Sequence, residues 1–178
     1  VLVALRFASP LPRGTGIAVG VSSGRYREQE LVVEERAGLQ LPKLSLEVQA
    51  ELRKILPLAG SIFGNPVDAV NLISPEAISA TMHVVGKVPD IHMLLYHLGF
   101  HPVSRWCDGR LSSATFLQPV IDTLIDVRQA TGKPVLLALR PAPDLHGMKD
   151  FLAAQEAFVG AGFPVFHSMR QAAKAMAR

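Results

Sequence analysis

Apolar residues along this chain fall into short runs that alternate with longer stretches of helical periodicity. The clearest runs are Ile17 to Val21 and Ile91 to Leu98, each bounded by turn residues, which is typical of buried strands. Shorter extended segments are predicted at 39–41, 135–139 and 164–166. The stretches between them carry apolar residues at helix spacing, and serines mark several predicted helix starts: Ser45, Ser74 and Ser168.

Strands that alternate with helices in this way predict an α/β fold. We expect a flavodoxin-like, five-stranded, mainly parallel sheet in the order 2-1-3-4-5, with helices on both faces in three layers. No repeat or linker interrupts the chain, so 1–178 is predicted to be a single domain. The sequence starts at Val1 without a methionine, and we therefore expect a fragment or subunit of a larger enzyme.

The stretch 16–41 is predicted to organise the rest as strand, tight turn, helix and strand. Its helix is expected over Arg25 to Ala37, with Gly38 at the position after the helix, where a positive φ is tolerated. The turn lies at the carboxyl end of its strand and at the amino end of its helix, where unpaired N–H groups favour an anion. We predict a phosphate-binding site there, formed by Ser22, Ser23, Gly24 and Arg25.

Composition excludes several functional classes. A hydrophobic content of 49% argues against disorder, and a net charge of +3 without a Lys/Arg run argues against nucleic acid as a partner. No apolar run reaches the roughly 18 residues of a membrane span. The single Cys107 forms no internal disulfide, which suits a reducing cytosol, so a cytoplasmic location is expected.

Neither a metal site nor a catalytic residue is predicted. His92 and His97 lie five residues apart in one strand and face opposite sides, and no carboxylate completes a set with His101. Cys107 is a nucleophile by residue type, but a lone cysteine is more often inert. Ordinary polar contacts are the expected role of these side chains.

Two other ligand classes suit the fold but not the residues. Tyr96 or Trp106 would stack on a flavin, yet the first turn lacks the length of a flavodoxin phosphate loop. A receiver-type acidic pocket requires paired carboxylates directly after the first strand, and that place holds Val21 and Ser22. Further side chains are predicted in loops at the ligand edge of the sheet: Asn65, Asp68 and Arg105.

Several short motifs follow one another in an order that resembles a known family. They are Gly-Leu-Gln-Leu-Pro at 38–42, Leu-Ser at 44–45, Leu-Pro at 56–57, Asn-Pro-Val-Asp at 65–68, Gly-Lys-Pro-Val at 132–135 and Ala-Gly-Phe-Pro-Val-Phe at 161–166. In this order they resemble the succinyl-CoA-ligase-like domain of NDP-forming acyl-CoA synthetases, which is similar to the C-terminal domain of succinyl-CoA synthetase β chains. The resemblance extends from about Leu11 to Arg178.

The resemblance implies a flavodoxin-like domain of an acid–thiol ligase. In that family a carboxylic acid, CoA and ATP or GTP with Mg give acyl-CoA, a nucleoside diphosphate and phosphate, through a phosphohistidine on another domain. The implied partners are a CoA-binding Rossmann domain and an ATP-grasp domain of the same ligase. No nucleotide clamp or phosphorylatable histidine is evident in this chain, so we expect the isolated chain to be inactive.

The chain departs from the family at the first turn. The family has a glycine-rich Asn-x-Gly-Gly-x-Gly turn there, and the residues at 22–27 retain only Gly24. Ser hydroxyls and arginines offer another way to hold an anion, whereas Glu28 and Glu30 would repel it. The alternative interpretation is therefore a non-catalytic homologue used for assembly or ligand sensing.

Overall fold

The computed structural model describes residues 10–21, 38–69, 72–99, 114–141 and 145–177. These residues form a five-stranded sheet in the order β2-β1-β3-β4-β5, with all neighbouring strands parallel. The strands are β1 (Ile17–Val21), β2 (Val67–Asp68), β3 (Met93–Gly99), β4 (Val135–Arg140) and β5 (Val165–Phe166). The helices of the described part are α3 (Leu46–Ile55), α4 (Pro75–Gly86), α6 (Ala114–Thr131), α7 (Leu145–Gly160) and α8 (Met169–Met176).

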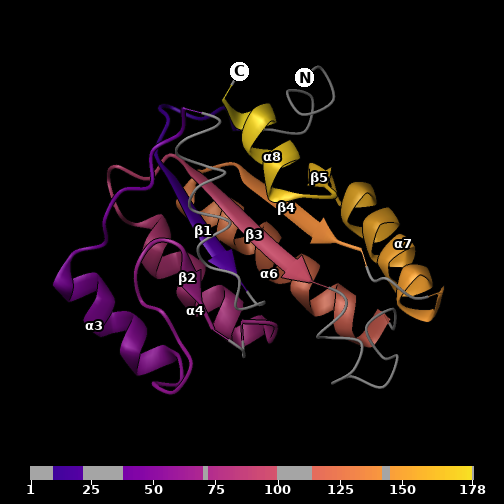
Figure 1. Ribbon diagram of the computed structural model, residues 1–178, viewed down its shortest axis with the longest axis horizontal. Coiled ribbons are helices and arrows are strands. Elements are labelled where there is room, and N and C mark those ends of the chain that lie inside the picture. The colour runs from indigo at the N-terminus through magenta and orange to yellow at the C-terminus, as the bar shows by residue number, and fades with distance from the viewer. Residues whose placement is uncertain (1–9, 22–37, 70–71, 100–113, 142–144, 178) are drawn as a thin grey trace.

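The sheet separates two apolar cores, one on each face (Figure 1). One core joins alternate strand residues to the helices α3, α4, α6 and α7, through Leu52, Ile78, Leu124 and Phe158. The other core joins the remaining strand residues to α8, through Ala172 and Ala173. Helices therefore cover both faces, and the predicted three-layer, flavodoxin-like α/β fold is confirmed. None of the described helices has the length and apolar content that crossing a membrane requires.

Serine side chains cap three helices at the positions that the sequence indicates. The Oγ atoms of Ser45, Ser74 and Ser168 accept hydrogen bonds from the backbone N–H three residues later, at 3.3, 3.2 and 3.3 Å. Each bond satisfies a donor that has no partner within its helix. Gly38 has the expected positive φ, 69°, but the helix predicted before it at 25–37 lies outside the described residues.

The predicted strand at 39–41 is not a strand of the sheet. Gln40 makes one parallel bridge with Gly16, and the position beside β1 belongs to Val67–Asp68 instead. The reason is Pro42: continuing the ladder would require its N–H to bond the carbonyl of Ile17, and proline has no N–H. The predicted strand order is correct, although a later segment fills its second position.

The side chain of Asn65 completes the ladder that Pro42 interrupts. Its Oδ1 accepts a hydrogen bond from the N–H of Val19 at 3.1 Å, and its Nδ2 donates to the carbonyls of Ile17 at 2.7 Å and Pro42 at 3.2 Å. The primary amide thus occupies the place of a backbone peptide unit between β1 and the chain at Pro42. Asn65 is only 9% exposed, so water does not replace these bonds.

We expect Asn65→Ala to destabilise the fold by about 3 kcal/mol or more, because it leaves buried main-chain groups of β1 without partners. Urea unfolding followed by circular dichroism measures the change. Gln118→Ala is the control, since Gln118 also bonds a side chain, Asp122, at 2.7 Å, but on an exposed helix face. We expect a loss of less than about 0.5 kcal/mol there. Equal losses in the two variants would contradict the role assigned to Asn65.

Candidate functional site

The carboxyl edge of the sheet is where open α/β folds bind ligands. The arrowheads of β1, β3 and β4 all point to this edge in Figure 1. The phosphate-binding turn predicted at Ser22, Ser23, Gly24 and Arg25 begins directly after β1, but it lies outside the described residues, as does Arg105. The described part of the edge consists of the last residues of the strands.

Three polar side chains lie on one face at this edge: Asp68 in β2, His97 in β3 and Arg140 in β4. Val21 is in register with both Asp68 and His97, and its side chain belongs to the core beneath α8. Residues in register on parallel strands point to the same face, so Asp68 and His97 flank Val21 on the α8 face. Arg140 lies two residues beyond Ala138, which is in register with His97 and belongs to that same core.

Burial and the neighbouring cation keep His97 neutral. The side chain is only 4% exposed, and loss of hydration lowers the pKa of His97 to about 4, with a further contribution from the positive charge of Arg140. At neutral pH the imidazole is therefore uncharged and too weak a base to take up a proton in catalysis. Arg140, partly exposed, supplies the fixed positive charge at this position.

The guanidinium of Arg140 is the group at this edge that suits recognition of an anion. A guanidinium forks onto two oxygens of a phosphate or carboxylate. Within the described residues there is no group of three or more side chains suited to hold a metal ion. The edge therefore offers binding and orientation to a negatively charged group.

Asn65 and Asp68, both predicted at the ligand edge, have different surroundings. The amide of Asn65 is engaged with the main chain of β1, Ile17 and Val19 included, so its observed role is structural. Asp68 is 5% exposed and ends β2 at the carboxyl edge. A ligand contact by either residue stays a prediction.

Sequence reasoning missed Arg140, and for His97 it weighed a metal-ligand role and expected ordinary polar contacts. The rule applied to the turn after β1 also applies to β4: a charged residue that directly follows an apolar strand lies at the carboxyl edge. Tyr96, considered as a flavin-stacking residue, is fully buried on the opposite face, where its hydroxyl donates to the carbonyl of Leu72 at 2.9 Å.

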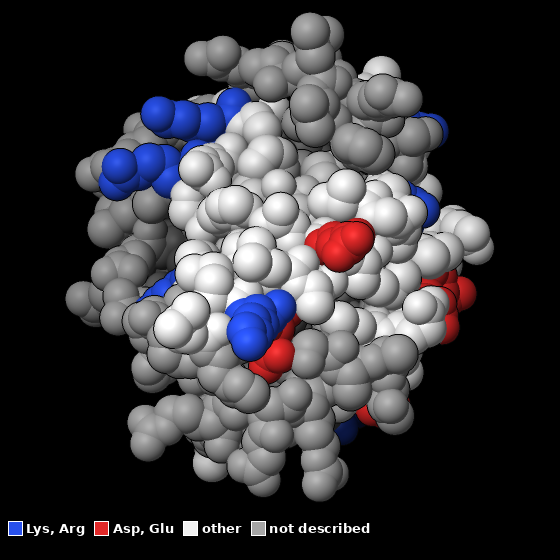
Figure 2. All heavy atoms as spheres, turned by 90° about the vertical axis from the view of Figure 1, so that its right-hand side faces the viewer, with Lys and Arg blue, Asp and Glu red and all other residues white. Residues whose placement is uncertain are grey.

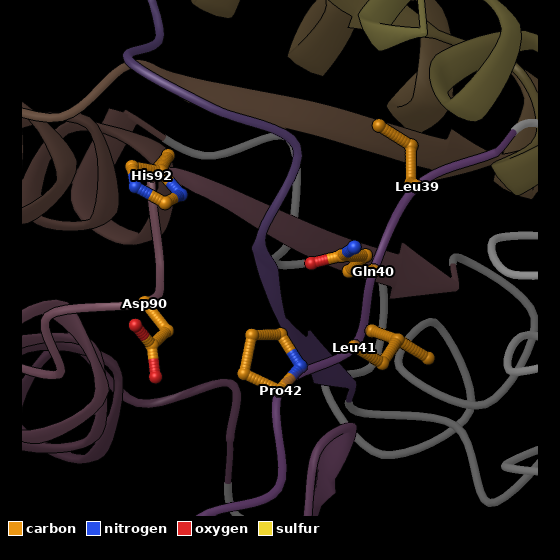
Figure 3. Close-up of a pocket in the computed structure, with 6 residues that line it drawn as sticks. All are labelled: Leu39, Gln40, Leu41, Pro42, Asp90 and His92. Carbon is orange, nitrogen blue, oxygen red and sulfur yellow. The ribbon is translucent and has the colours of Figure 1, made fainter.

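A pocket of about 530 Å³ lies at the opposite, amino end of the sheet. Asp90 and His92 form one side, and the segment from Leu39 to Pro42 forms the other (Figure 3). His92 precedes β3 and its Nδ1 is buried without a hydrogen-bond partner among the described residues. His92 therefore lies at the amino end of β3, whereas His97 lies near its carboxyl end.

Two longer proteins contain this fold. PH0766 from Pyrococcus horikoshii OT3 matches with a TM-score of 0.73 and 24% sequence identity, over 99% of this chain and 38% of that chain. A dinucleotide forming acetyl-coenzyme A synthetase 1 from Ca. Korarchaeum cryptofilum matches with a TM-score of 0.65 and 20% identity, over 98% of this chain and 34% of that chain. The same values hold for its complex with phosphate and ADP.

These similarities show the fold, since the identities are low. This chain spans little more than a third of either relative, 38% and 34% of their lengths. Neither a protein-family profile nor a curated protein sequence matches the chain.

The buried neutral state of His97 predicts a pH-dependent stability. Its pKa is lowered to about 4 in the fold from 6.5, so between those values the unfolded chain binds the extra proton and stability falls as the pH falls. From pH 7 to pH 5 this linkage removes about 2 kcal/mol. Between pH 7 and pH 5, the free energy of unfolding of His97→Gln, measured by urea unfolding, should fall by about 2 kcal/mol less than that of the parent.

Tyr96→Phe is the matched control in the same strand. It removes a buried hydrogen bond, to Leu72, but no group that titrates between pH 5 and pH 7. Its stability should therefore decline with falling pH as steeply as that of the parent. A His97→Gln variant with the parent's pH dependence would show that His97 is not held neutral.

Proposed function

We propose that this chain is a domain of an NDP-forming acyl-CoA synthetase, an acid–thiol ligase, and that its sheet edge faces a phosphate presented by another domain. The observation that carries the proposal is the fold shared with an acetyl-coenzyme A synthetase over 98% of this chain. The ordered motifs from 38–42 to 161–166 support it independently, because they resemble the same family.

The residues at the carboxyl edge suit this role. Arg140 provides a fixed cation, and His97 beside it is neutral and adds no charge of its own. The turn at 22–25 is proposed to add backbone N–H groups and a partial positive charge of about half an elementary unit from a helix amino end. Asp68 lies across Val21 from His97, so its carboxyl group favours an anion position nearer β3 and β4.

The rest of the reaction is assigned to other domains of the same ligase. The family resemblance implies a CoA-binding Rossmann domain with a phosphohistidine and an ATP-grasp domain that uses ATP or GTP with Mg. In this proposal 1–178 is one domain of that larger enzyme, which acts in the reducing cytosol. It positions the phosphate and contacts its partner domains, and it has no catalytic residue of its own.

The second candidate is a non-catalytic homologue that uses the fold for assembly or ligand sensing. The observation in its favour is the first turn, where only Gly24 remains of the glycine-rich pattern. The remainder of the open reading frame and its neighbours discriminate the two. Rossmann and ATP-grasp domains in the same chain or operon support the ligase.

Phosphate binding tests the role of the edge. We expect titration of the purified chain with inorganic phosphate to shift backbone amide resonances at 22–25, His97 and Arg140, and Arg140→Ala to weaken the binding about tenfold or more. Lys87→Ala is the control, because Lys87 is an exposed cation at the end of α4, away from this edge. Resonance shifts confined to the pocket at Asp90 and His92 would place phosphate at the amino end of the sheet and would contradict the proposed site.

Activity assays test the division of labour between domains. The chain 1–178 alone, with CoA, ATP or GTP, Mg and acetate, succinate or longer acids, should give no acyl-CoA above the buffer blank. Addition of the partner domains should restore turnover, and Arg140→Ala should lower it about tenfold. Turnover by the chain alone would show that it holds a complete active site.

A further inference from the structure

The outer face of α7 carries a row of exposed apolar side chains. Leu145, Leu152 and Val159 are 84%, 54% and 41% exposed. They follow one another at intervals of seven residues, which places them in one line along the helix. Single exposed apolar residues are ordinary on protein surfaces, but such a line is the pattern of helices that pack against another helix.

Uncharged residues make up much of the described surface around this row. Figure 2 looks onto the side of the molecule where α7 lies in Figure 1, and its described atoms are mostly uncharged, with a few separate acidic and basic groups. Small residues at Ala153 and Gly160 are also exposed beside the row, so another backbone can approach closely. The opposite side of α7 is fully used in the core, through Phe151, Ala154 and Phe158.

The charges on this face identify the partner. Lys149 and Glu156 are the exposed charged residues of α7, one before and one after Leu152. If two copies of α7 pack antiparallel about a twofold axis at Leu152, Lys149 of each copy meets Glu156 of the other. The same axis places Leu152 on Leu152 and Leu145 on Val159. In a parallel pairing the two copies of each residue would lie at the same level, so Lys149 of one copy would not reach Glu156 of the other.

We propose that α7 is the interface of a symmetric homodimer, in which the helices of two copies of this chain pack antiparallel with two Lys149–Glu156 ion pairs. A twofold contact requires that the same patch complement itself, and one positive and one negative charge on either side of Leu152 meet this requirement. One helix pair buries less surface than a standard interface, so the dimer is weak and depends on concentration.

Sedimentation of the full chain over about 10 to 1,000 µM measures the association, and we expect a shift from monomer to dimer within that range. Leu152→Lys should abolish the dimer. Leu58→Lys is the control for an added charge, because Leu58 is 70% exposed on another surface, and it should dimerise as the parent does. These positions are exposed, and an unchanged thermal midpoint confirms that each variant is folded.

A charge exchange decides between a second copy and any other occupant. Lys149→Glu and Glu156→Lys should each be monomeric alone, because each opposes equal charges in a homodimer. An equimolar mixture of the two should form dimers again, since each copy then supplies the charge that the other lacks. The double variant Lys149→Glu/Glu156→Lys should also dimerise, and Lys174→Glu on α8 is the control for a lost lysine.

Three results would overturn the proposal. They are a parent chain that stays monomeric up to the highest concentration, a dimer that Leu152→Lys does not weaken, and single charge variants whose mixture does not associate. If the parent is dimeric but the mixture of charge variants does not associate, the interface lies elsewhere on the molecule. None of these outcomes depends on phosphate binding at the sheet edge.

Discussion

The edge of β1 that faces away from β3 is the constraint on which the structure depends, because β2 pairs with only its last two residues. β3 satisfies one side of this central strand, and every buried N–H and carbonyl on its other side needs a partner as well. Three segments provide these partners, with the backbone of Gln40 at the start, the side chain of Asn65 in the middle and β2 at the end. The chain from 38 to 69 is thereby tied to one strand, and α3 is held within it.

The same strand sets the register of the polar edge. Because Val21 is aligned with Asp68 on one side and with His97 on the other, the end of β1 determines which side chains share a face. The guanidinium of Arg140 and the buried imidazole of His97 then lie on the same face, and His97 is neutral because of burial and this neighbouring cation. The hydrogen-bonded sheet fixes the spacing between these strands, so the side chains at their ends keep fixed relative positions.

Local sequence patterns predict most of this fold, but they predict few of the side chains that meet at the carboxyl edge of the sheet. Apolar runs and serine caps identify β1, β3, β4 and the helices α3, α4 and α8, because those signals span only a few residues. β2 was missed because Val67–Asp68 directly follow Asn65 and Pro66, which signal a turn. The amide of Asn65 bonds residues 46 and 48 positions away, which no local pattern indicates. The grouping of His97 with Arg140 depends on strand register, which no single segment contains.

The close approach at Gly16 has a consequence for how the amino-end pocket can change. A Cβ atom at Gly16 would lie 1.8 Å from the carbonyl oxygen of Asp90, so only glycine allows the two segments to cross. Beside this crossing, backbone hydrogen bonds hold His92 and Gln40: the N–H of His92 donates to the carbonyl of Gly16 at 2.8 Å, and that of Gln40 to the carbonyl of Thr15 at 3.1 Å. Main-chain atoms therefore fix the pocket's shape, and exchange of the Gln40 or His92 side chain would alter its chemistry while leaving its frame in place. In an evolving protein, such a hollow is a place where new specificity arises without loss of the fold.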